Sequence, residues 1–199
     1  MIDYYNDNSD VFIKSTVDCK MDEVYEPFLK NLNEGDRILD AGCGSGRDSL
    51  QFKKLGFNVE AFDISEKMVE AATDLTGIAV RRQSFLDIEY KEEFDAVWAC
   101  ASLLHVNRKM LPEAFKKLHE ALKKDGIMYC SFKLREQDYI KDGRSFTCFN
   151  EIDLNRFIKK LGIFEILQIY VTHDSRVDRK NELWINTILK KSSTNQIDN

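Results

Sequence analysis

A glycine-rich segment between residues 37 and 48 contains the residues best suited to binding a ligand. It reads Arg-Ile-Leu-Asp-Ala-Gly-Cys-Gly-Ser-Gly-Arg-Asp and joins a strand pattern to the start of a helix. Glycine in such a turn lets the backbone approach a ligand closely, because a Cβ would block it. Asp63 follows 17 residues after Gly46, at the end of the next strand pattern. A carboxylate in that place can accept hydrogen bonds from ribose hydroxyls.

The glycine spacing distinguishes this turn from two other nucleotide-binding loops. Gly42, Gly44 and Gly46 form G-x-G-x-G, and Arg47 stands where the dinucleotide-binding fingerprint has its last glycine. The lysine and the Ser/Thr of a phosphate-binding P-loop are also absent from this segment. The turn is therefore expected to bind a different ribose-containing ligand.

Positive charge occurs in the loops that follow the later strand patterns, in a chain with 29 Lys+Arg against 34 Asp+Glu. The candidates for contact with a substrate are Lys133, Arg144, Arg176 and Arg179. If these side chains converge, they would clamp a carboxylate, phosphate or other oxyanion, for which the planar arginine fork is suited. The alternative interpretation is a set of separate, solvated charges.

Alternating strand and helix patterns must position these residues. Strands are expected at 37–40, 57–63, 77–82, 94–100, 127–133, 164–172 and 182–191. The helix patterns between most of them predict parallel strands with helical crossovers, and so an open α/β sheet. The last two strands are separated only by 174–181, which predicts a hairpin that adds one antiparallel strand.

Three helix patterns have recognisable ends. The pattern at 107–123 precedes Gly126, which is suited to a left-handed cap. Ser65 and Asn150 are the expected N-caps of the other two helices, and Gly162 closes the second. The apolar residues expected to face inward on those two helices are Met68, Val69, Ala72, Leu75, Ile152, Phe157, Ile158 and Leu161.

At Ile38–Gly46 the sequence resembles motif I of the class I S-adenosylmethionine-dependent methyltransferases. Phe57–Asp63 resembles the second strand of that family with its ribose-binding acid, and Phe94–His105 resembles its fourth strand and following loop. Leu118–Phe132 and the terminal hairpin resemble the fifth and the reversed seventh strands. More narrowly, the chain is similar to small bacterial methyltransferases grouped with the tellurite-resistance type.

The resemblance implies an open, Rossmann-like α/β fold. Its seven strands would follow the order 3-2-1-4-5-7-6, with strand 7 antiparallel and helices on both faces. Residues 37–191 would form the methyltransferase domain. Residues 1–36, which show one helix pattern around Val24, Phe28, Leu29 and Leu32, would form a lid. Residues 192–199 show no apolar periodicity and are expected to be disordered.

The resemblance also implies the cofactor S-adenosylmethionine and a role for each matched residue. The residues that would hold it are Asp40 near its amino group; Gly42, Cys43, Gly44 and Gly46 in the turn; Asp63 at the ribose; Ile64, Met68, Phe85, Leu86 and Asp87 around the adenine; and Cys100, Ala101 and Ser102 below the sulfonium. Either Phe85 or Asp87 would stand where many relatives place an acid near the adenine amino group. Arg47 would reach the cofactor carboxylate or pair with an acid such as Asp63.

Methyl transfer from a sulfonium is an in-line displacement that depends on alignment and on exclusion of water. A general base is needed only if the acceptor must lose a proton. His105 is the candidate base, because imidazole titrates near neutral pH, and the alternative is a histidine bonded to backbone. Tyr5 is the second candidate catalytic residue, and beside Tyr4 it would belong to the lid or to a packed N-terminal arm.

Composition limits the class of acceptor. The net charge of −5 differs from the basic balance that is typical of nucleic-acid binders, and so disfavours a nucleic-acid partner. No apolar run is long enough for a membrane span. Five scattered cysteines without C-x-x-C predict reduced thiols in a cytoplasm and no metal site. The leading hypothesis is a methyltransferase acting on a small polar or anionic molecule. An RNA or protein methyltransferase and a non-catalytic cofactor-binding protein are the alternatives, and the oligomeric state stays open.

Overall fold

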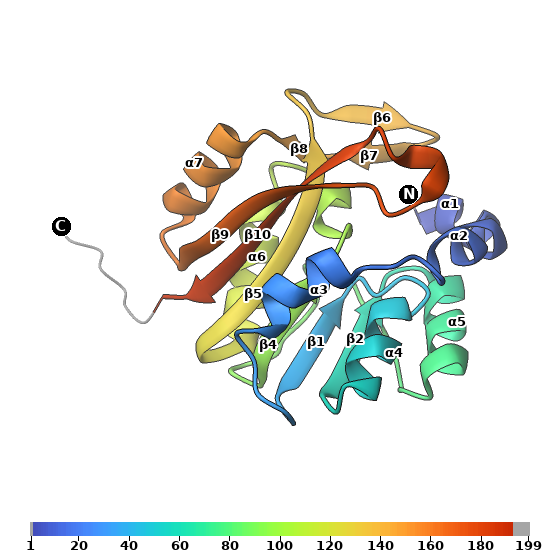
Figure 1. Ribbon diagram of the computed structural model, residues 1–199, viewed down its shortest axis with the longest axis horizontal. Helices are drawn as coiled ribbons and strands as arrows, with labels where there is room; N and C mark the ends of the chain where they lie inside the picture. The colour runs from blue at the N-terminus through green and yellow to red at the C-terminus, as the bar shows by residue number, and fades with distance from the viewer. Residues whose placement is uncertain (1, 193–199) are drawn as a thin grey trace.

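A mixed β-sheet forms the centre of the computed structural model, which describes residues 2–192 (Figure 1). Seven strands follow the order β3-β2-β1-β4-β5-β10-β9, and a short β8 pairs with β5. β1 to β5 run parallel to one another, whereas β10 runs antiparallel to both β5 and β9. The order predicted from the sequence is therefore confirmed. The strands are β1 (Arg37–Ala41), β2 (Asn58–Asp63), β3 (Arg81–Arg82), β4 (Phe94–Ala99), β5 (Leu122–Leu134), β8 (Cys148–Phe149), β9 (Phe164–His173) and β10 (Leu183–Lys191).

Helices cover both faces of the sheet. α3 (Asp22–Leu29) and α4 (Arg47–Lys54) lie on one face, α5 (Glu66–Thr76) packs beside α4, and α6 (Leu111–Ala121) and α7 (Glu151–Leu161) lie on the other (Figure 1). Alternate side chains of β4 pack against the helices on opposite faces of the sheet: Ala96 and Trp98 face α3, whereas Val97 and Ala99 face α6. Burial on both faces explains why the strand patterns are apolar throughout.

The caps predicted at Ser65, Asn150 and Gly162 are confirmed, but two residues expected to face inward do not face the core. Ser65 and Asn150 accept hydrogen bonds from the third backbone N–H of their helices, and Gly162 ends α7 with φ 67°. Leu75 is 38% exposed and Ile152 is 69% exposed. Thr76 and Leu154 are buried instead, because they continue the i, i+4 rows of Ala72 and Ile158.

Several local predictions needed correction. The helix expected at 107–123 is shorter, and Asp125, with φ 62°, takes the left-handed conformation that was expected of Gly126. Gly126 is required by packing, since a Cβ there would lie 2.9 Å from the Lys123 carbonyl oxygen. The strand expected at 77–82 contracts to β3, and a second hairpin, β6 (Tyr139–Lys141) with β7 (Arg144–Phe146), was not predicted.

The N-terminal 36 residues carry two helices more than the one pattern predicted. α1 (Ile2–Asp7) and α2 (Ser9–Thr16) precede α3. Neither has the long apolar stripe from which sequence patterns predict helices, and α2 has no buried residue. Two 3₁₀ turns, η1 (Leu103–His105) and η2 (Val177–Arg179), complete the described elements. The predicted disordered tail lies outside the described residues except for Ser192.

Candidate active site

The glycine-rich turn between β1 and α4 is a backbone cradle at the carboxyl edge of the sheet. Gly42, Gly44 and Gly46 have φ of 76°, 54° and 82°, the left-handed region that favours glycine. A Cβ on Gly42 would lie 2.6 Å from Ser102 Cβ. The turn is also anchored to β2, because the backbone N–H groups of Gly42 and Cys43 both donate to the carbonyl oxygen of Phe62. Its shape is therefore fixed by the sheet.

Asp63 closes the cradle from the end of β2. Its Oδ2 accepts a hydrogen bond from Gly44 N at 2.9 Å, and its Oδ1 accepts one from Ser65 N at 2.9 Å. Burial raises the pKa of this carboxyl, while the hydrogen bonds from the backbone oppose the shift. Each oxygen has a further lone pair, so Asp63 can still accept hydrogen bonds from a ligand.

Asp40 lies at the end of β1 with only 2% of its surface exposed. Ser49 Oγ donates to its Oδ2 at 2.5 Å. Burial raises the pKa of Asp40 to about 8, and repulsion by the nearby Asp48 adds to the shift. The ligand-free protein therefore holds this carboxyl largely protonated at neutral pH.

Asp48, which sequence reasoning missed, is the partner of Arg47. Its carboxylate accepts hydrogen bonds from Arg47 Nε at 2.6 Å, Tyr25 Oη at 2.6 Å and Trp98 Nε1 at 2.8 Å. Burial by itself would raise the pKa of Asp48, but the Arg47 guanidinium and these hydrogen bonds hold it below the usual value. Arg47 therefore already has a carboxylate partner, and it is not Asp63. The only sequence signal for this pairing was that Asp48 is an acidic residue in the first turn of α4.

One cavity of about 440 Å³ joins the cradle to side chains from both ends of the chain. It brings together most of the residues predicted from the sequence: Tyr5, Asp40, Gly42, Cys43, Gly44, Asp63, Ile64, Met68, Phe85, Leu86, Cys100, Ala101, Ser102, His105, Lys133, Arg144, Arg176 and Arg179. Gly46 and Asp87 do not line it. Gly46 is the N-cap of α4 and packs against α5. Asp87 is exposed and accepts a hydrogen bond from Ser84, so the geometry does not place it at the adenine pocket.

Tyr5 from α1 and His105 from η1 meet at one wall of this cavity. Tyr5 Oη lies 2.8 Å from His105 Nε2, and His105 Nδ1 lies 3.0 Å from the carbonyl oxygen of Ser145. A carbonyl only accepts, so Nδ1 carries the proton and Nε2 of the neutral ring accepts the Tyr5 hydroxyl proton.

The expectation that His105 titrates near neutrality is wrong. Burial lowers its pKa to about 4, and the charge of Arg144 adds to this. Burial also raises the pKa of Tyr5. At neutral pH the pair is therefore an uncharged hydroxyl–imidazole chain.

Arg144, at the start of β7, lies beside this pair and is 8% exposed. Its guanidinium carbon stands 3.6 Å from the ring centre of Tyr4 and 5.3 Å from that of Phe146. One Nη donates to Asp142 at a long 3.4 Å. Its buried Nε has no hydrogen-bond partner among the described residues.

The other three predicted cations already have carboxylate partners. Lys133 pairs with Asp174 at 3.3 Å and with Glu182, and Arg176 binds both oxygens of Asp174 at 2.8 and 2.7 Å. Arg179 is 3.7 Å from Asp178. The geometry therefore does not support an oxyanion clamp of four cations. Arg144 also has a carboxylate nearby, Asp142 at 3.4 Å, but its buried Nε has no hydrogen-bond partner among the described residues.

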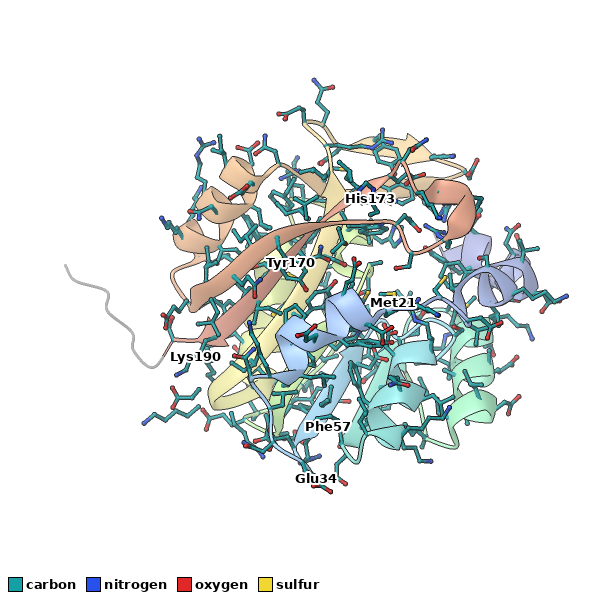
Figure 2. All side chains as sticks on the ribbon, in the orientation of Figure 1. Met21, Glu34, Phe57, Tyr170, His173 and Lys190 are labelled. Carbon is teal, nitrogen blue, oxygen red and sulfur yellow. The ribbon has the colours of Figure 1, made fainter. Side chains whose placement is uncertain are left out.

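The N-terminal helices lie over the cradle. Asn6 Oδ1 accepts a hydrogen bond from Ser65 Oγ at 2.8 Å, and the Thr16 carbonyl accepts one from Arg47 at 3.4 Å. The segment between α2 and α3 reaches the opposite wall, where Ser175 Oγ contacts Met21 Sδ at 3.2 Å. Figure 2 shows Met21 near the middle of the molecule and His173 above it, on the strand that leads into the β9–β10 turn.

The cradle fits S-adenosylmethionine by its own features. The turn leaves no space for a Cβ on Gly42, Asp63 has free lone pairs beside the turn, and the buried Asp40 can pair with a cation once it has lost its proton. Residues 38–126 match the family model of the methyltransferase domain. β1 to the start of β5 are therefore similar to a methyltransferase domain, and S-adenosylmethionine is the cofactor that this site fits.

Individual relatives show the same pattern over part of the chain. An uncharacterized methyltransferase of Staphylococcus carnosus (strain TM300) is 31% identical over 119 residues, which cover 57% of this chain and 56% of that protein. The tRNA (carboxymethyluridine(34)-5-O)-methyltransferase of Arabidopsis thaliana is 34% identical over 119 residues, which cover 56% and 27%. The chain spans about half the length of the first curated relatives that it matches.

The fold is shared over nearly the whole chain. The 1,6-didemethyltoxoflavin-N1-methyltransferase of Burkholderia thailandensis, solved with 1,6-didemethyltoxoflavin and S-adenosylhomocysteine, superposes with a TM-score of 0.79 at 20% identity. The match covers 96% of this chain and 85% of that one. Between residues 2 and 192, no helix has the length and apolar character needed to cross a membrane.

Proposed function

We propose that this protein is an S-adenosylmethionine-dependent methyltransferase whose acceptor is a small polar or anionic molecule. The observation that carries the proposal is the single cavity that runs from the glycine cradle to Tyr5, His105 and Arg144. The N-terminal helices that bond to Ser65 and Arg47 cover this cavity. A covered site of about 440 Å³ suits a small acceptor better than a macromolecule.

The cofactor, when bound, supplies an electrophilic methyl group on a sulfonium. Asp40 would pair with its amino group, Asp63 would accept hydrogen bonds from its ribose, and the turn from Gly42 to Gly44 would lie against its methionine part. Met68, Ile64, Phe85 and Leu86 would flank the adenine, and Cys100 to Ser102 would form the floor. Residues 1–36 would act as a lid, because α1 and α2 join the cradle to the wall that holds His105.

The Tyr5–His105 pair can remove a proton from an acceptor. As the acceptor attacks the methyl carbon, its proton would pass to Tyr5 Oη while the Tyr5 proton passes to His105 Nε2. Nδ1 would keep its proton and donate it to the Ser145 carbonyl oxygen, and this hydrogen bond stabilises the resulting imidazolium. Because the pKa of His105 is low, its imidazole would hold the transferred proton only briefly. The pair would then lose that proton and be neutral again before the next cycle.

Cofactor binding and transfer are tested separately. S-adenosylhomocysteine should raise the melting temperature of the wild-type protein, and labelled S-adenosylmethionine should transfer its methyl group to the small-molecule fraction of a cell extract. Tyr5→Phe should lower the transfer rate about 10²- to 10⁴-fold, the range for loss of general acid–base catalysis, with unchanged affinity for S-adenosylhomocysteine. Tyr170→Phe, on the exposed-edge strand β9, is the control.

The alternatives predict other outcomes of the same assay. An RNA or protein methyltransferase would label the macromolecular fraction, as the names of some relatives suggest for those proteins. A non-catalytic cofactor-binding protein would be stabilised by the ligand and would label neither fraction. The narrower resemblance to tellurite-resistance methyltransferases stays a prediction that a tellurite-tolerance assay can test.

A further inference from the structure

We infer that Arg144 selects the acceptor, and that the acceptor is a small molecule whose carboxylate pairs with this guanidinium. The inference rests on the proposed function, because it assigns the acceptor end of the same cavity. Its basis is the geometry around β7, where a buried cation lines the cavity with Asp142 at 3.4 Å from one Nη and with an Nε–H that has no hydrogen-bond partner among the described residues.

Arg144 is unusual in having an open hydrogen-bonding edge in a buried place. A buried polar group without a partner costs about 1–3 kcal/mol, and more when it is charged. The Nε–H of Arg144 has no partner among the described residues, and the carboxylate that Arg144 contacts, Asp142, stands 3.4 Å from Nη2 and is half exposed. A ligand that accepts from Nε and one Nη would satisfy both donors at once.

The aromatic side chains around the guanidinium fix its plane. Tyr4 stacks at 3.6 Å, and Tyr5 and Phe146 stand at 5.7 and 5.3 Å from the guanidinium carbon. Stacking of this kind leaves the in-plane N–H groups free, and the planar fork matches the two oxygens of a carboxylate. The ring arrangement therefore presents Arg144 as a prepared receptor for a flat, bidentate anion.

The charge balance of the wall favours a monoanion over a phosphate dianion. Lys133 and Arg176 are neutralised by Asp174 and Glu182, and Asp142 adds negative charge near Arg144. Arg179 and Lys141 also line the cavity but are more exposed, so Arg144 is the buried cation that is available for the ligand. A carboxylate would match that single charge, whereas a dianion would be left with an excess of negative charge in a buried site.

The same placement connects the anion to the proton-transfer pair. Tyr5 lies between Arg144 and His105, since its hydroxyl bonds to the imidazole and its ring faces the guanidinium. A carboxylate on Arg144 would therefore hold the rest of the acceptor against the Tyr5 hydroxyl. This explains why an arginine whose Nε–H has no partner in the fold would be buried beside the candidate base.

The test uses the full chain with labelled S-adenosylmethionine and a metabolite extract of molecules below 1 kDa. One portion of the extract is untreated, one has its carboxylates capped with a carbodiimide and methylamine, and one is treated with phosphatase. Wild-type protein should label the untreated and phosphatase-treated portions and should lose most of its labelling with the capped portion. Labelling of the capped portion at the untreated rate, or loss only after phosphatase treatment, would overturn the inference.

Three variants assign the effect to Arg144. Arg144→Gln should lower transfer to the untreated extract about 10- to 100-fold, which corresponds to a hydrogen bond to a charged group. Arg144→Lys should retain part of the activity, because it keeps the charge and loses the fork. Arg156→Gln, which removes a charge from the exposed face of α7, should have no effect. All three should bind S-adenosylhomocysteine like the wild type by calorimetry.

The outcomes separate this inference from the proposed function. Full activity of Arg144→Gln overturns the role of Arg144 while the methyltransferase assignment stands. Failure of the wild type to bind S-adenosylhomocysteine overturns the proposed function itself. Binding without labelling of any small molecule overturns both the carboxylate acceptor and the small-molecule assignment.

Discussion

Binding of the cofactor should release a proton from Asp40, and replacement of Asp40 by asparagine should abolish this release. Burial and the neighbouring Asp48 raise the pKa of Asp40 to about 8, compared with 3.8 for an ordinary aspartate. If the ligand's ammonium group requires the carboxylate, binding at pH 7 must first expel this proton. The affinity of the wild type is then reduced by the fraction of molecules in the ionised state.

The magnitude follows from that pKa. About one molecule in 11 has Asp40 ionised at pH 7 and about ten in 11 at pH 9, because one pH unit is a tenfold change in the ratio. The Kd for S-adenosylhomocysteine should therefore decrease about tenfold between pH 7 and pH 9, or about 1.4 kcal/mol. The ligand-free protein should respond in the opposite direction. Folded Asp40 keeps a proton that the unfolded chain has lost, so the free energy of unfolding falls as pH rises from about 4 to about 8.

Calorimetry in two buffers of different ionisation enthalpy measures the released proton directly. Wild type should release about 0.9 protons per ligand at pH 7 from this group. Asp40→Asn should bind S-adenosylhomocysteine more weakly and should release no proton from position 40. Protons released by the ligand's own ammonium group are the same for both proteins, so they cancel when the two measurements are subtracted. Ser49→Ala, which removes a hydrogen bond that stabilises the carboxylate, should shift the change to higher pH. A wild-type Kd that is constant from pH 7 to pH 9 would refute the coupling.

Three further changes have predictable effects. Gly42→Ala places a Cβ 2.6 Å from a neighbouring side-chain carbon at a φ of 76°, so S-adenosylhomocysteine binding should be lost in calorimetry and stability should fall by about 1–3 kcal/mol. Asp48→Asn leaves the buried Arg47 without its carboxylate and should cost about 3–5 kcal/mol in urea unfolding. The pKa of about 4 for His105 predicts that the free energy of unfolding falls as pH decreases from about 6.5 to about 4, by up to about 3 kcal/mol, because the unfolded chain takes up a proton that folded His105 refuses.

Matched variants test each of these expectations. Gly162→Ala has a similar φ of 67° with open space around its Cβ, so it measures backbone strain alone and should leave ligand binding intact. Asp153→Asn removes an exposed carboxylate and should cost less than about 1 kcal/mol. His105→Gln should lose the acid-dependent decrease. Equal effects of the Gly42 and Gly162 variants on binding would argue against a steric role for Gly42.

The cofactor half of the site was accessible from sequence because its determinants are local. The residues from Asp40 to Gly46 lie in one turn, and Asp63 ends the next strand, so parallel pairing of β1 with β2 brings them together. The helix caps at Ser65 and Asn150 were predictable for the same reason, since a cap depends on residues three positions apart. Leu75 and Ile152 were misplaced because apolar character alone does not say which of two adjacent rows of a helix meets the sheet.

The acceptor half depended on contacts between distant parts of the chain. The pairing of Tyr5 with His105 crosses 100 residues, and it required two short helices that the N-terminal pattern did not predict. The predicted clamp of four cations was wrong because Asp174 and Glu182, on the same hairpin as Arg176, form ion pairs with Lys133, which is distant in the sequence but close in the fold. Spacing along the sequence does not show which charges are already paired.

The sequence by itself determined the strand–helix alternation and the glycine cradle, which follow from hydrophobic patterns and from backbone conformations that only glycine adopts readily. Its resemblance to the class I methyltransferases implied the sheet order and the cofactor. The tertiary structure decided the protonation of His105 and Asp40 and left the buried Nε of Arg144 without a partner among the described residues. Those properties depend on burial and on the charges that surround each group, and both are set by packing between segments far apart in the chain.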